Sequence, residues 1–309
     1  MIASFSAAGD PVVAVTALTR HFGAKAALDD VSITVPRGIV FGLVGANGAG
    51  KTTLIKHVLG LLKAQSGSVR VFGLDPVAEP AQVLRRIGYV SEEHDLPGWM
   101  RVWELLRYYQ AFYSNWDLAY AADLCRRFEL DLQAKVKVLS KGQRARANLL
   151  VALAHRPELL VLDEPSSGLD PLVRRDILEA IIRAIADEGR TVLFSSHLLH
   201  EVERVSDHVT MINQGKIVFS APLDDIKQTH RCLTLRFEEP RAQPPALPGV
   251  LTWQGAGQEW SAVCRDGTAE LVSAIEVSGA RIVADRVPSL DEIFMARVGS
   301  ANVLAATED

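Results

Sequence analysis

The strongest structural signal in the chain is the segment IVFGLVGANGAGKTT at residues 39–53. It begins with a short apolar run, Ile39–Val44, of the kind that forms a strand buried in a parallel sheet. Residues 45–52 then match the pattern G-x-x-x-x-G-K-[ST]. From Lys51 to Leu62 apolar residues recur at helical spacing, which predicts a helix with one apolar face. The order of strand, glycine-rich loop and helix predicts a phosphate-binding loop.

The residue types in this loop suit the binding of a nucleotide. Glycines let the backbone wrap around phosphates, so that consecutive N–H groups and the helix N-terminus point at the anion. Lys51 supplies a positive charge to the β- and γ-phosphates, and Thr52 offers a hydroxyl ligand to Mg²⁺. The alternative is a glycine turn at a strand–helix junction. Since glycine is about 7% of residues, such a match arises by chance in about one per cent of chains this long. The other residues predicted to bind the nucleotide are Gly45, Asn47, Gly48, Ala49, Gly50 and Thr53.

A second apolar run, at residues 159–162, ends in the two carboxylates Asp163 and Glu164. A buried strand of this kind delivers Asp163 to the C-terminal edge of the sheet, where it is placed to hold Mg²⁺. Glu164 is then placed to polarise a water molecule for attack on the γ-phosphate. Taken alone, the segment fits equally well a strand that ends in a solvated acidic turn. The phosphate-binding loop favours the catalytic interpretation.

Strand and helix signals alternate along the first two thirds of the chain. A third apolar run lies at residues 191–194. Before it, Asp170 and Pro171 form an N-cap followed by proline at the first helical position, and Gly189 is placed to end that helix after Glu188. This alternation predicts an α/β core with a mostly parallel sheet.

Residues 96–132 are rich in aromatic side chains at helical spacing. They predict a helical insertion between core strands, at about residues 95–140. Two interpretations of the aromatic residues stay open, a packed core and a surface that contacts another protein.

The pattern changes again after a hairpin-like segment at residues 208–220. From about residue 225 the sequence predicts a small α+β unit, with a proline-rich loop at residues 240–248. Residues 225–309 hold eight basic and twelve acidic residues, which accounts for the whole net charge of −4. The expected strands are 232–237, 250–253, 260–263 and 282–284, and the expected helices are 268–277 and 289–297.

Composition excludes several classes of protein. The chain has 309 residues, of which 48% are hydrophobic and 23% charged, as in ordinary globular proteins and unlike disordered or collagen-like ones. The acidic C-terminal unit argues against nucleic acid as a partner. Cys125, Cys232 and Cys264 show no metal-ligand spacing. The sequence has no secretory signal and no run of about 20 apolar residues, so we expect that the chain does not cross a membrane.

Four further motifs, in order, carry a resemblance to a known family. The segment LSKGQ at residues 139–143 resembles the signature motif of the ATP-binding-cassette (ABC) ATPases, and EPSSGLDP at residues 164–171 resembles their acidic strand end and following loop. His197 resembles the family's switch histidine, and Phe22 the aromatic residue that stacks on adenine. With the phosphate-binding loop, the resemblance covers about residues 12–224. It implies a P-loop NTPase cassette with a RecA-like core sheet, an N-terminal antiparallel β part and a helical insertion.

The resemblance also implies how the site is assembled. Two cassettes pair head to tail, and each ATP lies between the phosphate-binding loop of one and the signature motif of the other. His197 would contact the γ-phosphate and orient the attacking water, so that Lys51, Glu164 and His197 are the expected catalytic residues. The residues expected to reach the nucleotide across the dimer interface or from the following loop are Ser140, Gly142, Gln143 and Asp170.

Two positions depart from the family pattern. Glu92 stands where many cassettes have a glutamine, as it does in cassettes of the type-2 exporter branch, and its carboxylate can still bind Mg²⁺ or water. Lys141 replaces a glycine of the signature, and Gly142 still permits a close backbone approach.

The resemblance implies the ATP-hydrolysing subunit of an ABC exporter. Such a subunit sits on the cytoplasmic face of the membrane and binds a separate permease, through a groove formed by the helical insertion and residues 92–101. The alternatives are a cassette that remodels nucleic acid or ribosomes, and a scaffold with negligible turnover. Residues 1–224 would form the nucleotide-binding domain and residues 225–309 an accessory domain, which serves either dimer contact and regulation or passive stabilisation.

Overall fold

The computed structural model describes residues 10–93, 96–186, 189–265 and 269–305. The chain divides into two compact units, residues 1–220 and 221–309. The boundary expected from the sequence, after residue 224, falls inside the helix α8 (Leu223–Gln228) of the second unit. Each unit has its own hydrophobic core.

A six-stranded sheet forms the centre of the first unit, in the order β5-β6-β7-β3-β8-β9. Its first five strands pair in parallel. Every residue of β3, β6 and β7 is buried, as expected for apolar runs covered on both faces. The predicted α/β core with a mostly parallel sheet is therefore correct. The strands are β3 (Val40–Val44), β5 (Ile87–Val90), β6 (Leu159–Asp163), β7 (Thr191–Ser196), β8 (His208–Asn213) and β9 (Lys216–Pro222).

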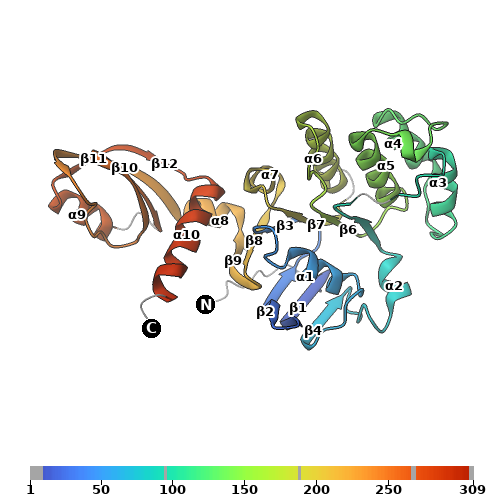
Figure 1. Ribbon diagram of the computed structural model, residues 1–309, viewed down its shortest axis with the longest axis horizontal. Helices are drawn as coiled ribbons and strands as arrows, with labels where there is room; N and C mark the ends of the chain where they lie inside the picture. Colours follow the sequence, from blue (N-terminus) through green and yellow to red (C-terminus); the bar gives the residue numbers. More distant parts are fainter. Residues whose placement is uncertain (1–9, 94–95, 187–188, 266–268, 306–309) are drawn as a thin grey trace. The chain divides into compact units, whose positions relative to one another are not determined.

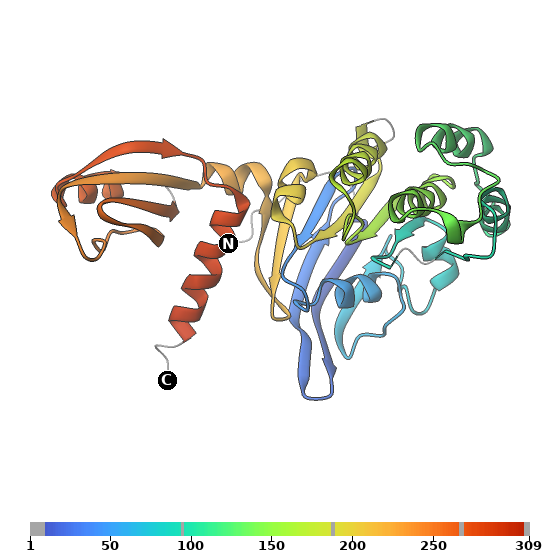
Figure 2. The same cartoon turned by 45° about the horizontal axis from the view of Figure 1, so that its top comes forward.

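Helices cover both faces of this sheet. Helices α5 (Lys141–Leu153), α6 (Pro171–Ala186) and α7 (Leu199–Val205) lie on one face, and α1 (Lys51–Val58) lies on the other (Figures 1 and 2). The helix α1 ends four residues before the predicted Leu62. Gly60 follows it in a left-handed conformation with φ 71°, which ends the helix. The predicted end of α6 at Glu188 lies outside the described residues.

A smaller antiparallel sheet, in the order β2-β1-β4, packs on the same side as α1 (Figure 1). Its inward-facing residues join those of β3 and α1 in one apolar cluster, which fixes the loop between β3 and α1. The strands are β1 (Val13–Phe22), β2 (Lys25–Val35) and β4 (Ser66–Val71).

The predicted helical insertion consists of two helices rather than one continuous helix. Asp117 caps the second of them by accepting a hydrogen bond from the N–H of Tyr120, so the chain turns between them. Some aromatic residues pack, as Tyr113 does against His155, whereas the side chains of Trp99 and Phe112 are 72% and 60% exposed. The elements of the insertion are α3 (Val102–Gln110), α4 (Leu118–Arg127) and the short 3₁₀ helix η1 (Val136–Val138). A further short helix, α2 (Pro80–Leu84), precedes β5.

The second unit is the predicted small α+β fold. Its sheet has the order β11-β10-β12, and α9 and α10 pack against it. The two short strands expected at residues 250–253 and 260–263 are parts of one strand, β11. Thr268, the predicted start of α9, lies outside the described residues. The elements are β10 (His230–Arg241), β11 (Val250–Arg265), α9 (Ala269–Val277), β12 (Ala280–Arg286) and α10 (Leu290–Ala305).

Among the described residues, no helix combines the length and the apolar character that crossing a bilayer requires. The three cysteines are buried and form no disulfide.

Candidate functional site

The phosphate-binding loop joins the buried strand β3 to the helix α1. Gly48 and Gly50 have φ angles of 78° and 117°, a region that favours glycine. A side chain at Gly50 would also lie 2.6 Å from the carbonyl oxygen of Ala27. Gly50 is the N-cap of α1 and provides no side-chain cap, so the first N–H groups of the helix stay open for an anion. The predicted residues Gly45, Asn47, Ala49 and Thr53 lie in the same loop and first helical turn.

Lys51 is the buried cation of this loop, with a side chain only 6% exposed. Its Nζ donates hydrogen bonds to the carbonyl oxygens of Gly45, at 2.6 Å, and Ala46, at 3.3 Å. It also lies 2.9 Å from Oε1 of Glu164. The ammonium thus has two hydrogen bonds within the loop and one ion pair outside it. Lys51 is thereby held between the loop and the end of β6.

Asp163 and Glu164 lie side by side with Ser195 of β7 at the C-terminal edge of the sheet. Ser195 Oγ donates a hydrogen bond to Oδ1 of Asp163 at 2.7 Å and accepts one from the N–H of Glu164 at 3.0 Å. Burial raises the pKa of Asp163, and the negative charge of Glu164 adds to this effect, whereas hydrogen bonds from Ser195 and Thr52 oppose it. The carboxylate of Asp163 therefore meets the hydroxyl of Thr52 beneath the loop.

Glu164 contacts both of the other predicted catalytic residues, Lys51 and His197. Its Oε1 pairs with Lys51, and its Oε2 lies 2.7 Å from Nδ1 of His197. Its backbone has φ 49°, a left-handed conformation that is rare for a residue with a side chain and is common at functional sites. The side chain of Glu164 is 5% exposed and that of His197 34%, so the cluster is reached from the side of the histidine.

Glu92 and Phe22 are two further residues predicted to bind the metal ion or the nucleotide. Glu92 is exposed, and its Oε1 accepts a hydrogen bond from Ser167 Oγ at 3.3 Å. Phe22 ends β1 and is 49% exposed, with the guanidinium of Arg20 at 4.8 Å from the centre of its ring. An exposed ring at this place can stack on a base.

The signature residues form a separate group. Ser140 and Gln143 cap α5 reciprocally, each side chain accepting a hydrogen bond from the other's N–H, at 3.1 Å and 3.0 Å. Gly142 is buried against Val173 of α6, and Asp170 accepts hydrogen bonds from the first N–H groups of α6. In the described part of the chain, the hydrogen bonds of these residues lie within their own helix ends and not on residues 45–53. The signature residues and the phosphate-binding loop are thus two separate groups within the first unit.

Several buried polar residues around the cluster were not predicted from the sequence. Ser195 joins Asp163 to Glu164, and Ser166 and Ser196 both donate hydrogen bonds to Glu201. The sequence offered one signal: Ser195 and Ser196 are polar residues that end an otherwise apolar strand next to His197. Glu201 carried no such signal, because a charged residue in the first turn of a helix is usually solvated.

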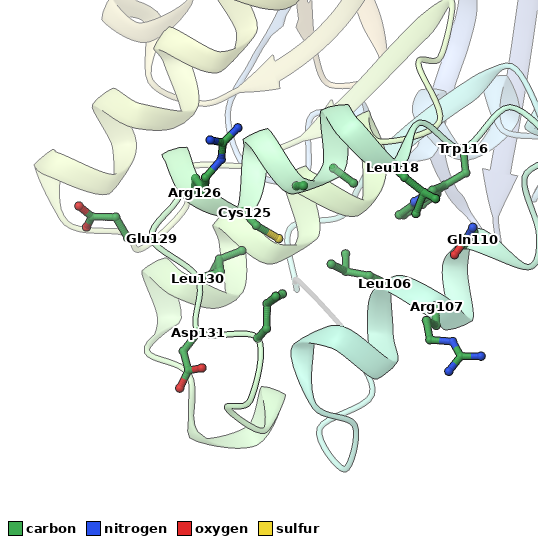
Figure 3. A pocket seen from close by; sticks show the side chains of 13 residues that line it. Leu106, Arg107, Gln110, Trp116, Leu118, Cys125, Arg126, Glu129, Leu130 and Asp131 are labelled. Atoms are coloured by element: carbon green, nitrogen blue, oxygen red, sulfur yellow. The ribbon is translucent and has the colours of Figure 1, made fainter.

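A groove of about 680 Å³ lies in the helical insertion, away from the predicted nucleotide residues. Figure 3 shows Leu106 and Gln110 on one of its sides and Trp116, Leu118, Cys125 and Leu130 on the other. Burial raises the pKa of the Cys125 thiol, so the thiol stays protonated and uncharged and adds to the apolar lining. The groove predicted for a permease combines the helical insertion with residues 92–101, whereas the residues that line this groove all lie at positions 106–132 of the insertion.

Sequence comparison places the chain among transport ATPases. The family model described as ABC transporter matches residues 28–167. The uncharacterized ABC transporter ATP-binding protein YdbJ of Bacillus subtilis is 34% identical, over 84% of this chain and 82% of its own length. The bacitracin transport ATP-binding protein BcrA of Bacillus licheniformis is 33% identical, over 71% of this chain and 72% of its own.

Solved structures show the same fold. A structure described as the ATP-binding subunit of an ABC transporter superposes with a TM-score of 0.65 at 31% identity, over 70% of this chain and 92% of its own. The ATP-binding cassette MJ1267 of an ABC transporter gives a TM-score of 0.62 at 28% identity, over 72% and 95% of the two chains. The P-loop cassette predicted from the motifs is confirmed.

Proposed function

This chain belongs to the ABC transporter family, and from that premise we propose that it hydrolyses ATP to drive export through a separate membrane permease. The observation that supports this most directly is the meeting of Lys51, Glu164 and His197 at one edge of the sheet. Such a cluster places a cation, a base and a hydrogen-bonding imidazole around one point. The names of the relatives do not favour the alternative role in remodelling nucleic acid or ribosomes.

The ion pair between Lys51 and Glu164 explains how binding and hydrolysis can be linked. The β- and γ-phosphates compete with Glu164 for the ammonium of Lys51, so a bound nucleotide frees the carboxylate. Glu164 then accepts a proton from the attacking water while the new P–O bond forms and the bond to the leaving ADP breaks. His197, hydrogen-bonded to the other oxygen of Glu164, orients the same water.

The residues beneath the loop fit Mg²⁺. The hydroxyl of Thr52 and the carboxylate of Asp163 are the oxygen ligands that this ion prefers. Burial raises the pKa of Asp163, and the negative charges of Glu164 and Glu92 add to this effect, so a divalent cation would favour its ionised form. Among the described residues, no group of three His, Cys, Asp or Glu side chains is arranged to hold a metal, so phosphate oxygens would complete the ligand set. When bound, the ion neutralises charge on the phosphates.

The separate position of the signature residues supports a dimer. Ser140 and Gly142 lie at the N-terminus of α5, which favours an anion. They make no hydrogen bond or ion pair to the phosphate-binding loop within the described part of this chain. A second cassette, identical or related, would bring its own phosphate-binding loop to them, as the family resemblance implies.

The helical insertion supports a contact with the permease. Trp99 and Phe112 are strongly exposed, and the groove in Figure 3 offers a further apolar surface. Exposed apolar patches of this kind are typical of surfaces that contact other proteins. The subunit would then work at the cytoplasmic face of the membrane.

The test is the variant Glu164→Gln, which keeps the shape of the side chain and removes the base. We expect it to bind ATP, to lose at least about 99% of its turnover, and to accumulate as an ATP-bound dimer in gel filtration. Lys51→Ala is the control, because it removes the phosphate contact and should abolish both turnover and dimerisation. Wild-type turnover in either variant contradicts the proposed catalytic roles, and a monomeric Glu164→Gln protein in ATP contradicts the dimer.

A further inference from the structure

Glu201 is a buried carboxylate that the proposed reaction does not use. It lies in the first turn of α7 and is only 1% exposed. A buried charge is costly unless hydrogen bonds and an opposite charge satisfy it. Its partners therefore indicate what it does.

The two oxygens of Glu201 have different partners. Oε2 accepts hydrogen bonds from Ser166 Oγ at 2.6 Å and from Ser196 Oγ at 3.1 Å. Oε1 lies 3.1 Å from Nε of Arg174 on α6, which supplies the opposite charge. One oxygen thus joins two serines that are 30 residues apart in the sequence.

Both serines lie within two residues of a proposed catalytic residue in the sequence. Ser166 lies two residues after Glu164, in the loop at residues 165–170, and Ser196 precedes His197. Ser196 Oγ also accepts a hydrogen bond from the N–H of Leu198 at 3.0 Å, so the turn at residues 195–198 is fixed from both sides of His197. Movement of either segment would change the distance of 2.7 Å between Nδ1 of His197 and Oε2 of Glu164.

We propose that Glu201 is a positioning residue that holds the loop at residues 165–170 and the turn at residues 195–198 together, and so keeps Glu164 and His197 in register for hydrolysis. This inference rests on the proposed ATPase function. In the described part of the chain, the polar partners of Glu201 are Ser166, Ser196 and Arg174, and none of them belongs to the phosphate-binding loop. Its removal should therefore affect the chemical step more than nucleotide binding.

Glu201→Gln tests this with little change of volume. Glutamine has one carbonyl oxygen, so it cannot accept from the serines with one end and pair with Arg174 through the other. We expect kcat to fall by about tenfold or more, with KM for ATP changed less than about threefold. Glu158→Gln is the matched control: it also removes an ion-paired carboxylate of the same unit, but Glu158 pairs with Arg86 and Arg37 before β6 begins.

Hydrogen exchange of the full-length protein separates this inference from the proposed function, because it does not require turnover. The N–H groups of Ser167 and Leu169 report on the loop, and that of Leu198 reports on the turn. We expect Glu201→Gln to raise exchange in both segments, Ser166→Ala in the loop alone and Ser196→Ala in the turn alone. The two serine variants keep the test available if Glu201→Gln does not fold.

Each outcome either supports or contradicts the positioning role of Glu201. Exchange that rises in both segments of Glu201→Gln, with kcat lowered and KM retained, supports the positioning role. Exchange unchanged in either segment, or a KM that rises in parallel with a lost kcat, overturns it. A wild-type protein that turns over no ATP contradicts the proposed function, while the exchange pattern still decides whether Glu201 joins the two segments.

Discussion

Two buried charged residues at the edge of the sheet, Lys51 and Glu164, form an ion pair, and His197 contacts the second of them. Lys51, Glu164 and His197 form a continuous series of contacts of 2.9 Å and 2.7 Å, and Glu164 adopts a left-handed backbone to take part in it. Breaking one partner of such a group leaves a buried charge without compensation, which costs about 3–5 kcal/mol. In the proposed mechanism, a phosphate group that enters the site replaces the contact between Lys51 and Glu164.

His155 is a second buried titratable residue in the first unit. Its ring stacks on Tyr113 with 3.8 Å between ring centroids, and Nε2 donates to the carbonyl oxygen of Ile87 at 3.1 Å. Burial lowers the pKa of His155 to about 4, because desolvation disfavours the charged form. His155 therefore binds fewer protons in the folded protein than in the unfolded chain between pH 4 and 6.5.

His155→Gln should make stability less sensitive to acid. Folding lowers the pKa of His155, so the contribution of its neutral form to stability is fully present above pH 6.5. This contribution is lost as the pH falls towards 4. The loss from this residue amounts to about 3 kcal/mol, and it disappears in the variant. Urea unfolding at pH 7, 5.5 and about 4 measures it. Asn115→Ala is the control, because it removes a hydrogen bond to the carbonyl oxygen of His155 without removing a titratable group. Parallel pH curves for wild type and His155→Gln contradict this account.

The residues that we propose to be catalytic could be selected from the sequence because each of them lies in a recognisable segment. Lys51 follows the glycines of the phosphate-binding loop, Asp163 and Glu164 end an apolar strand, and His197 was recognised by family resemblance. Ser166 and Glu201 were not predictable, because their roles depend on a contact between two segments 35 residues apart in the sequence. Local patterns identify residues that meet a ligand more readily than residues that hold those residues in place.

At the scale of elements, the contact between α5 and α6 depends on the absence of a side chain. A Cβ atom at Gly142 would lie 2.5 Å from Cγ2 of Val173, closer than packed atoms allow. The signature motif therefore requires this glycine for packing within the chain, in addition to any approach of a nucleotide.

Gly142→Ala should destabilise the first unit by about 1–3 kcal/mol through overpacking. The second substitution Val173→Ala removes the methyl groups that the new side chain meets, so in that background Gly142→Ala should cost little or nothing. Urea unfolding of the wild type, both single variants and the double variant measures the coupling. An equal cost of Gly142→Ala in both backgrounds would show that Val173 is not the constraint.

Elements were predicted best where the apolar pattern was continuous. The runs that became β3, β6 and β7 were located to within one or two residues, because strands buried on both faces contain few polar positions. The helical insertion was predicted as one aromatic-rich segment, and the turn before α4 was missed, since aromatic spacing alone does not show where a helix stops. In the second unit, two short strands were expected where β11 continues through Gly255 and Gly257, which ordinarily weaken a strand.

At the scale of the whole molecule, the chain divides its charge and its chemistry unequally. All the residues of the proposed ATP site lie in the first unit, whereas the net negative charge lies in residues 225–309. The second unit has its own core, formed by residues of β10, β11, α9 and β12. The composition of the whole chain is therefore an average over two units with different properties. Only the sequence motifs show which unit holds the proposed ATP site.

Separate folding of the two units gives the last prediction. The strand β9 ends at Pro222, and α8 packs against β10 through Ile226, whose carbonyl oxygen accepts a hydrogen bond from Nδ1 of His230 at 2.8 Å. The helix α8 thus belongs to the second unit, and a cut after Pro222 separates complete elements. A cut after Asp224 would instead divide α8. It would leave Ile226, which is 4% exposed in the chain, in an incomplete helix.

We therefore expect fragment 1–222 to be soluble, to unfold cooperatively and to retain ATP turnover, and fragment 223–309 to fold around its own core. Calorimetry of the full-length chain should show two transitions, each matching one fragment. Fragment 225–309 is the matched control: without the start of α8 it loses the buried side chain of Leu223 and should unfold at lower temperature than fragment 223–309. A full-length chain that unfolds in a single transition, with an insoluble fragment 1–222, would show that the core of the ATPase depends on the second unit, because neither hydrophobic cluster would then be stable without the other.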